Sequence, residues 1–206
     1  MMQEDFIYDS GEGLWFTSDS HWSHQKIIEL CNRPFSSVEE MNEKLIENWN
    51  SVVKPTDTVF HLGDFCFGGS QAWNSVLDRL NGNILLIKGN HDEKNLKQGF
   101  MMKFKWVGYQ LHLLIENRSI YLNHFPFLCY GGTYRNPENQ VWQAFGHIHS
   151  GPYSESGRDL NRSKLIFPTQ YDVGVDNNNF TPISWEQLKE KINKQVEDYA
   201  KNDKTV

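Results

Sequence analysis

Short apolar runs that lead into polar, chemically active residues are the feature of this sequence that most restricts its fold. Residues 84–87 form one such run, and the tetrapeptide Gly-Asn-His-Asp follows at 89–92. A continuous apolar run of this length is typical of a strand buried on both faces, and the glycine permits a sharp turn after it. Taken alone, the tetrapeptide fits a plain polar turn equally well, because Asn and Asp can hydrogen-bond to their own backbone.

Two earlier runs end in the same way. Residues 14–17 lead to Asp19 and His21, and residues 58–62 lead to a glycine followed by Asp64. In open α/β folds, ligands bind where buried parallel strands end. The three runs therefore place polar side chains where a binding site is expected.

Helical patterns separate these predicted strands. The capping-box pattern occurs twice within residues 36–40, and apolar residues then recur at three- and four-residue steps over 38–52. A second helical pattern covers residues 71–80 and ends near an Asn-Gly pair. Repeated strand–loop–helix units predict a parallel α/β layer in the first half of the chain.

The second half reads as mostly strands. Runs at 109–115 and 120–122, joined by a hairpin turn, are followed by runs at 141–145, 165–167 and 171–175. His124 comes directly after the second of these runs, and His147 and His149 come after the third. The histidine pair lies two residues apart on an extended segment, so both side chains point to the same side.

The chain ends in a clear helix signal. Ser184 and Gln187 match a capping box, and Ile183 and Leu188 match a hydrophobic staple. We expect a short lead-in over residues 1–13 and a frayed tail over 201–206, because both are polar. The length of 206 residues suits one domain that spans 1–206.

Composition narrows the class of protein. The net charge of −6 speaks against an extended nucleic acid as partner, since that requires clustered Lys and Arg. No apolar run is long enough to span a bilayer, so we expect no membrane partner. Cys31, Cys66 and Cys129 are odd in number and scattered, which predicts free thiols in a reducing, cytoplasmic compartment. The sequence leaves the oligomeric state open.

Five predicted strand ends thus carry a selected set of residue types. They are Asp19 with His21, Asp64, Asn90 with His91, His124, and His147 with His149. Imidazole and carboxylate ligands suit manganese, iron or zinc, and the set is unlike a thiolate-rich structural zinc site. Any single histidine here could be an ordinary hydrogen-bonded core residue. Their repeated placement favours a metal centre.

In order and spacing, these motifs resemble the five signature motifs of the calcineurin-like metallophosphoesterase family. The Arg-Pro-Phe sequence at 33–35 and the capped helix after it resemble small bacterial and phage members. The resemblance implies an α/β fold, a four-layer αββα sandwich of two mixed β-sheets flanked by helices. It also implies two divalent metal ions, with manganese as our first choice and iron, zinc, nickel or cobalt as alternatives.

The resemblance also implies a role for each motif residue. The first metal would be held by Asp19, His21 and His149, and the second by Asn90, His124 and His147. Asp64 would bridge both ions, and a hydroxide between the ions would attack phosphorus in line with the bond that breaks. His91 would bind no metal and would face the leaving group.

Further candidates lie near these motifs. Asp92 could orient His91 as part of the catalytic site, or could simply cap the turn. His24 could line the substrate mouth. Arg33 or Arg135 could bind a substrate phosphate through two parallel hydrogen bonds, although an ordinary surface arginine is the slightly preferred interpretation of each.

The residues after Asp64 bear on the substrate. The chain continues Phe-Cys-Phe-Gly-Gly and lacks the Asp-Arg-Gly continuation of the family's protein Ser/Thr phosphatases. We therefore expect a small phosphate ester as substrate, namely a phosphodiester of a nucleotide-like compound. Phosphomonoester hydrolysis is the alternative within the enzyme class. A non-catalytic metal-binding scaffold or binding module is the alternative from another class.

Overall fold

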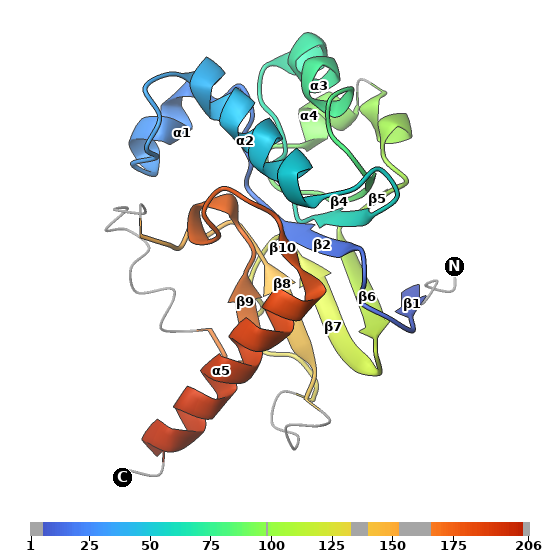
Figure 1. The fold of residues 1–206 in the computed structure, drawn as a ribbon, viewed down its shortest axis with the longest axis vertical. Helices are drawn as coiled ribbons and strands as arrows, with labels where there is room; N and C mark the ends of the chain where they lie inside the picture. The colour runs from blue at the N-terminus through green and yellow to red at the C-terminus, as the bar shows by residue number, and fades with distance from the viewer. Residues whose placement is uncertain (1–5, 98, 133–139, 153–165, 204–206) are drawn as a thin grey trace.

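A computed structural model describes residues 6–97, 99–132, 140–152 and 166–203, and within them two five-stranded sheets pack together (Figure 1). The first sheet has the order β1 (Phe6–Tyr8), β6 (Gln110–Ile115), β7 (Arg118–Asn123), β8 (Trp142–Phe145) and β9 (Gln170–Asp172). The second has the order β10 (Ile183–Ser184), β2 (Leu14–Thr17), β3 (Thr58–His61), β4 (Asn83–Ile87) and β5 (Trp106–Gly108). Each sheet mixes parallel and antiparallel pairs. The prediction of two mixed sheets flanked by helices is confirmed.

The parallel layer predicted for the first half is strands β2 to β5. Successive side chains of a strand point to opposite faces. Accordingly, Val59 and Ile84 pack toward the helices, whereas Phe60 and Leu85 pack between the sheets. Burial on both faces explains why these strands read as continuous apolar runs.

Helices cover one face of that sheet (Figure 1). They are α1 (Gln25–Leu30), α2 (Val38–Val52), α3 (Gly69–Leu77) and α4 (Glu93–Leu96), followed by the 3₁₀ helix η1 (Phe100–Lys103). The Ser37 hydroxyl accepts the Glu40 backbone N–H at 3.1 Å and so caps α2, while the Glu40 carboxylate accepts the Ser36 N–H at 2.8 Å instead of that of Ser37. Trp49 of α2 and Trp73 of α3 are fully buried against the sheet.

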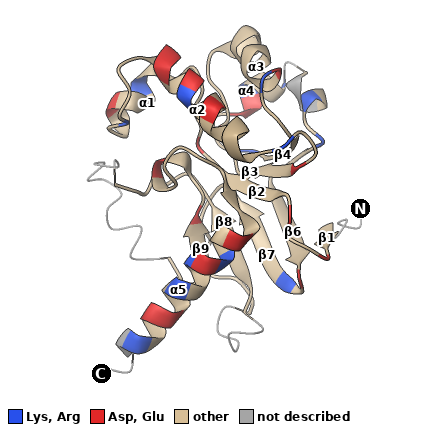
Figure 2. Ribbon diagram, in the orientation of Figure 1, with Lys and Arg blue, Asp and Glu red and all other residues tan. Residues whose placement is uncertain are grey.

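A second hydrophobic core lies between the two sheets, and the C-terminal helix α5 (Trp185–Asp203) packs against it. The Ser184 N–H donates to Gln187 Oε1 at 2.8 Å and the Gln187 N–H donates to Ser184 Oγ at 3.2 Å, which confirms the predicted capping box. Ile183 and Leu188 are both buried, as the staple requires. Figure 2 shows acidic and basic residues alternating along the rest of α5.

Some element boundaries differ from the predictions. Residues 6–8, which were expected to belong to a lead-in, form the strand β1. This strand pairs in parallel with β6 at the edge of the first sheet. The helix predicted over 71–80 is α3, which ends at Leu77, and α5 continues to Asp203 where a frayed tail was expected. Of the strand predicted at 165–167, residue 165 lies outside the described residues and 166–167 are not strand.

The strand predicted over 171–175 also ends early. The β9 strand stops at Asp172, and the 3₁₀ helix η4 (Val175–Asn177) follows. The Asp172 carboxylate accepts the Gly174 N–H at 2.8 Å, and the Asn177 side chain donates to the Asp172 carbonyl at 2.9 Å. These local bonds turn the chain, because they satisfy groups that a longer strand would pair with its neighbour.

Two features of the whole chain can be checked as well. Within the parts of the chain that the structure describes, no helix is long and apolar enough to cross a membrane. Cys31, Cys66 and Cys129 are all free, which confirms the prediction of unpaired thiols. The extent of the domain over 1–206 stays a prediction.

Candidate metal centre

The polar strand ends meet at one place because the strands that carry them run in parallel. Asp19, Asp64 and Asn90 follow β2, β3 and β4 of one sheet. His124 and His147 follow β7 and β8, a parallel pair of the other sheet. The loops of both sheets therefore contribute to a single site.

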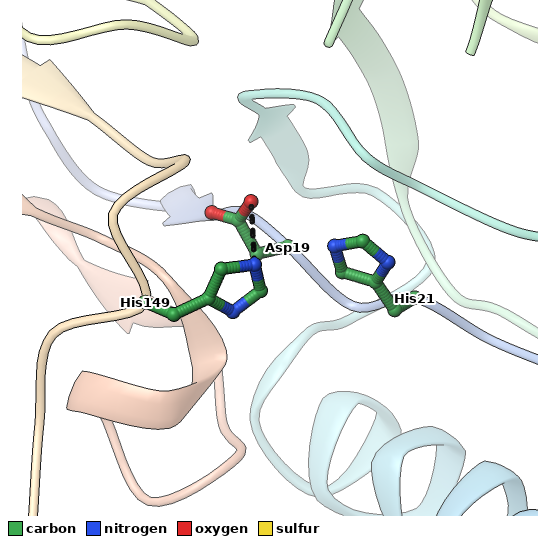
Figure 3. A group of neighbouring side chains, drawn as sticks. All are labelled: Asp19, His21 and His149. Atoms are coloured by element: carbon green, nitrogen blue, oxygen red, sulfur yellow. Dashed lines mark ion pairs between the residues drawn. The ribbon is translucent and has the colours of Figure 1, made fainter. Parts of the chain in front are cut away.

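The candidate metal ligands form two compact groups. One consists of Asp19, His21 and His149, shown in Figure 3, and the other of Asp64, His124 and His147; in each, the ligand atoms lie within 4.8 Å of one another. Asn90 joins the second group, since its Oδ1 lies 3.0 Å from His124 Nε2. Asp64 Oδ2 lies 3.5 Å from His21 Nε2 and 3.6 Å from His124 Nε2, between the groups. The arrangement agrees with the predicted sets; their metal-binding roles stay a prediction.

Two buried atoms of the first group are unsatisfied by the protein itself. Asp19 Oδ1 and His21 Nε2 are shielded from solvent and have no hydrogen-bond partner. A buried polar atom without a partner costs about 1–3 kcal/mol. A divalent cation between the two atoms would remove this cost, so the donor set fits a metal ion.

Three of the four histidines are oriented by contacts at Nδ1. His124 Nδ1 donates to the Leu62 carbonyl at 2.7 Å, and His149 Nδ1 donates to Asp176 Oδ2 at 2.8 Å. His21 Nδ1 lies 3.1 Å from His24 Nδ1. A proton held at Nδ1 leaves the Nε2 lone pair available, which is the usual arrangement of metal-binding histidines.

The backbone of the site is strained. Five candidate ligands have φ between 47° and 73°, in the left-handed region that non-glycine residues avoid: Asp19, His21, Asp64, His147 and His149. Such strain costs of the order of 1–3 kcal/mol per residue and clusters at functional sites. Hydrogen bonds hold the strained loops, since the His21 N–H donates to the Asp64 carbonyl at 3.0 Å and the His147 N–H to Asp19 Oδ2 at 2.8 Å.

Glycine is required at two places beside the ligands. A Cβ atom on Gly89 would lie 2.2 Å from Asp64 Oδ1, and one on Gly146 would lie 2.3 Å from Asp19 Oδ2. Both distances are shorter than any tolerable contact. The glycines before Asn90 and His147 therefore let the loops of different strands approach each other closely.

The electrostatics of His21 and Asp64 favour the protonation states that bind cations. Burial lowers the pKa of His21 to about 4, so its ring is neutral at pH 7. Burial alone would raise the pKa of Asp64, but the adjacent imidazoles of His21 and His124 hold it well below its usual range. Since metal ligands must be deprotonated, both groups are ready to bind. His149 differs: burial alone would lower its pKa, but the charge of Asp19 and the hydrogen bond to Asp176 raise that pKa well above its usual value.

Asp92 does not orient His91. Its carboxylate is fully buried and accepts the backbone N–H groups of Gly89 and Asp64, each at 2.8 Å, and of Phe65 at 2.9 Å. Both oxygens are occupied by the backbone. These bonds favour a structural role for Asp92 over the expected role in orienting His91, and they serve the loop after β3 as well as its own turn.

The candidates for substrate binding have different outcomes. The Arg33 side chain is completely buried and paired with Asp176 at 2.8 Å, so the prediction that it binds substrate is wrong. His24 lies at the site, where its ring stacks on Phe67 with a centroid distance of 3.8 Å; its contact with substrate stays a prediction. Arg135 lies outside the described residues.

Sequence reasoning missed two buried carboxylates beside the site. Asp176 contacts His149 and Arg33, and Asp172 accepts the Ser150 N–H at 3.0 Å. Burial raises the pKa of Asp172 to about 6. The available signal was the last predicted run, 171–175, which is interrupted and followed by aspartates.

The fold and this cluster of imidazoles and carboxylates define a metal-binding α/β protein, and comparison with known proteins places it in a family. The family model described as calcineurin-like phosphoesterase matches residues 14–198. The chain therefore belongs to the calcineurin-like phosphoesterase family. Membership supports a metal-dependent hydrolase of phosphoric esters.

Relatives occur in an archaeon, in a phage and among bacterial structures. The chain is 34% identical over 186 residues to uncharacterized protein MJ1445 of Methanocaldococcus jannaschii, covering 88% of this chain and 92% of that protein. It is 28% identical over 188 residues to the Gene 66 protein of Mycobacterium phage L5, covering 79% and 86%. The crystal structure of AQ665 from Aquifex aeolicus, a protein of unknown function, matches with a TM-score of 0.64 at 24% identity, covering 86% and 97%. This last likeness supports the fold alone.

Proposed function

We propose that the protein is a dinuclear metal-dependent phosphodiesterase that hydrolyses a nucleotide-like ester. The observation that carries the proposal is the pair of ligand groups, each within 4.8 Å, with Asp64 between them. One cation would be held by Asp19, His21 and His149. The other would be held by Asn90, His124 and His147. Asp64 would bind both cations. When bound, two such cations supply a nucleophile of lowered pKa and neutralise charge on the phosphoryl oxygens.

The donor set guides the choice of metal. Imidazole and carboxylate ligands without thiolate suit manganese, with iron, zinc, nickel and cobalt as alternatives. A neutral His21 and an ionised Asp64 need lose no proton before they bind. Asp64 would contribute a negative charge to both cations, which would reduce their mutual repulsion.

His91 is the candidate general acid. Its side chain is 46% exposed, and its Nε2 lies 3.9 Å from Asp64 Oδ2, beside the two ligand groups but in neither. The His91 N–H donates to Asp64 Oδ1 at 2.9 Å, which fixes the backbone of His91 relative to the metal centre. An imidazolium there can protonate the departing oxygen, or stabilise its charge by a hydrogen bond.

A cavity beside His91 supports a large leaving group. It has a volume of about 780 Å³, within the range of small-molecule sites, and its lining includes Asn90, His91 and Phe67. Lys94 and Lys97 also line it; Lys97 pairs with Glu93, whereas Lys94 has no ion pair with any described residue. A positive lysine in this cavity favours an anionic leaving group, such as a nucleotide.

The test is hydrolysis of bis-p-nitrophenyl phosphate and p-nitrophenyl phosphate by protein stripped with a chelator and refilled with manganese. We expect metal-dependent turnover that is faster for the diester. Asp64→Asn should abolish it by weakening metal binding. His91→Ala should keep both metals and lose about 10²-fold or more in rate, the usual contribution of a general acid. His112→Ala is the matched control, because this half-buried histidine bonds Ser119 instead of the site.

Each contrary outcome has a definite meaning. Full activity of metal-free or Asp64→Asn protein would refute the mechanism. Faster turnover of the monoester would make the protein a phosphomonoesterase. A protein that binds no metal and turns over neither substrate would be a binding module.

A further inference from the structure

We propose that Arg33 and Asp176 are positioning residues that set the affinity of the first metal position. The inference rests on the proposed function, because it concerns the ligand group of Asp19, His21 and His149. Arg33 and Asp176 form a buried ion pair. The hydrogen bonds of this pair reach the loop that carries Asp19 and His21, and they reach the His149 ring. Arg33 follows α1, and Asp176 lies in η4, far along the chain.

The ion pair has no access to water. Both side chains are 0% exposed, Arg33 Nε donates to Asp176 Oδ1 at 2.8 Å, and Arg33 Nη2 donates to Asp176 Oδ2 at 2.8 Å. Burying two charges costs several kcal/mol of desolvation per ion, which their attraction offsets only when further hydrogen bonds satisfy them. A role in stability alone would be met as well by two apolar side chains.

Two further bonds of Arg33 hold the loop after β2, and a third runs from Nη1 to Met41 Sδ of α2 at 3.4 Å. Its Nη2 donates to the Asp19 carbonyl at 2.7 Å, and its Nη1 donates to the Ser20 carbonyl at 3.0 Å. Asp19 and His21, on either side of Ser20, have φ values of 55° and 51°. The guanidinium thus stabilises the strained conformation that directs both ligands into the site.

The bonds of Asp176 hold the third ligand. His149 Nδ1 donates to Asp176 Oδ2 at 2.8 Å, which turns His149 Nε2 toward the site, where it lies 3.8 Å from Asp19 Oδ1 (Figure 3). A carboxylate behind a metal-binding imidazole fixes the ring and makes its free nitrogen a stronger donor. The pair therefore orients all three ligands of the first position.

The second ligand group has different supports. His124 is held by the Leu62 carbonyl at 2.7 Å, and Asp64 by the His91 N–H at 2.9 Å. Neither support involves Arg33 or Asp176. The His147 N–H donates to the Asp19 side chain at 2.8 Å, whereas Arg33 holds the Asp19 carbonyl. Loss of the pair should consequently weaken one metal position and leave the other unchanged.

The experiment is a calorimetric titration of chelator-stripped protein with Mn²⁺. Wild type should bind two ions. Asp176→Asn should bind one ion as wild type does and the other about 10- to 100-fold more weakly, the usual effect of losing such a support. His149→Ala removes a candidate ligand of the first position, so the binding step that it weakens is the step that belongs to this position. Asp198→Asn, at an exposed acidic residue of α5, is the matched control and should match wild type.

Arg33→Lys is the second variant. It keeps the positive charge but cannot span the same four oxygen acceptors, so we expect a smaller loss at the same step. If circular dichroism shows that Asp176→Asn does not fold, Arg33→Lys decides the matter alone. Wild-type affinity at both steps in a folded variant would overturn the inference, and so would equal weakening of both steps. A wild type that binds fewer than two ions would instead overturn the proposed function, and this inference with it.

Discussion

Asp92 shows how a single buried carboxylate can shape the site through bonds to the backbone. It accepts N–H groups from Gly89, Asp64 and Phe65, and so joins the loop after β3 to the loop after β4. Charged acceptors make stronger hydrogen bonds than neutral ones. The candidate bridging residue and the candidate general acid therefore depend on one anchor.

Replacement of Asp92 by Asn should test this anchor. An amide has one acceptor oxygen, so at least one of the three N–H groups would lose its partner. We expect the free energy of unfolding to fall by about 1–3 kcal/mol. The measurement is urea unfolding of metal-free protein at pH 8, above the pKa of about 6 to which burial raises this carboxyl. Unchanged stability of Asp92→Asn would show that the anchor is dispensable.

Residues with a chemical signature were predictable, and residues that support them were not. The candidate ligands could be found because each follows an apolar run as His, Asp or Asn. Arg33 and Asp176 lie 143 positions apart, and nothing local reveals that they meet. Arg33 looked like a surface arginine or a phosphate ligand because sequence does not report burial.

Among the elements, those with a strong local signal were predicted well. The α2 and α5 helices each begin at a capping serine, and β2 to β4 follow continuous apolar runs. The strands that were missed or misplaced are short and lie at sheet edges. The three residues of β1 and of β9 depend on partners elsewhere in the chain, which local pattern cannot supply.

The turn between β6 and β7 provides a prediction at this level. Its Glu116 accepts the Gly11 N–H at 3.0 Å and the Lys189 ammonium of α5 at 2.6 Å, so the turn is tied to two distant segments. The Lys189 hydrogen bond, together with that of Gly11, lowers the pKa of Glu116 from 4.5 to about 2. A carboxyl with a lowered folded-state pKa contributes stability above its unfolded pKa and loses it as the pH falls toward its folded pKa.

Glu116→Gln should therefore have a lower Tm than wild type at pH 7, and the difference should shrink as the pH falls from 5 toward 2. Thermal unfolding of both proteins across this range is the measurement. Lys189→Met removes the largest cause of the shift and should lower Tm at pH 7 as well. The Tm of the double variant should fall by less than the sum of the decreases in the two single variants, since the residues act as a pair. A Tm difference that is constant with pH would contradict the assignment.

For the whole molecule, the most informative feature is that each ligand group combines both sheets. Asp19 and His21 come from the β10-β2-β3-β4-β5 sheet and His149 from the other, while Asp64 faces His124 and His147 across the same boundary. The general class of fold was predictable, because repeated strand–loop–helix units admit few arrangements. The pairing of specific loops was implied only by resemblance, since contacts between sheets depend on the packing of the complete core.

Metal binding should accordingly stabilise the protein as a whole. A cation that binds the folded chain and crosslinks two sheets adds about 2.7 kcal/mol per site at a concentration 100-fold above its Kd. For a chain of this size, that corresponds to roughly 5–11 °C in Tm per site. We expect chelation to lower Tm, added Mn²⁺ to restore it in proportion to the logarithm of its concentration, and Asp64→Asn to respond far less. An identical Tm with and without Mn²⁺ would mean that the two sheets close over this site without a metal, and that the strain at its five left-handed residues is supported by the protein alone.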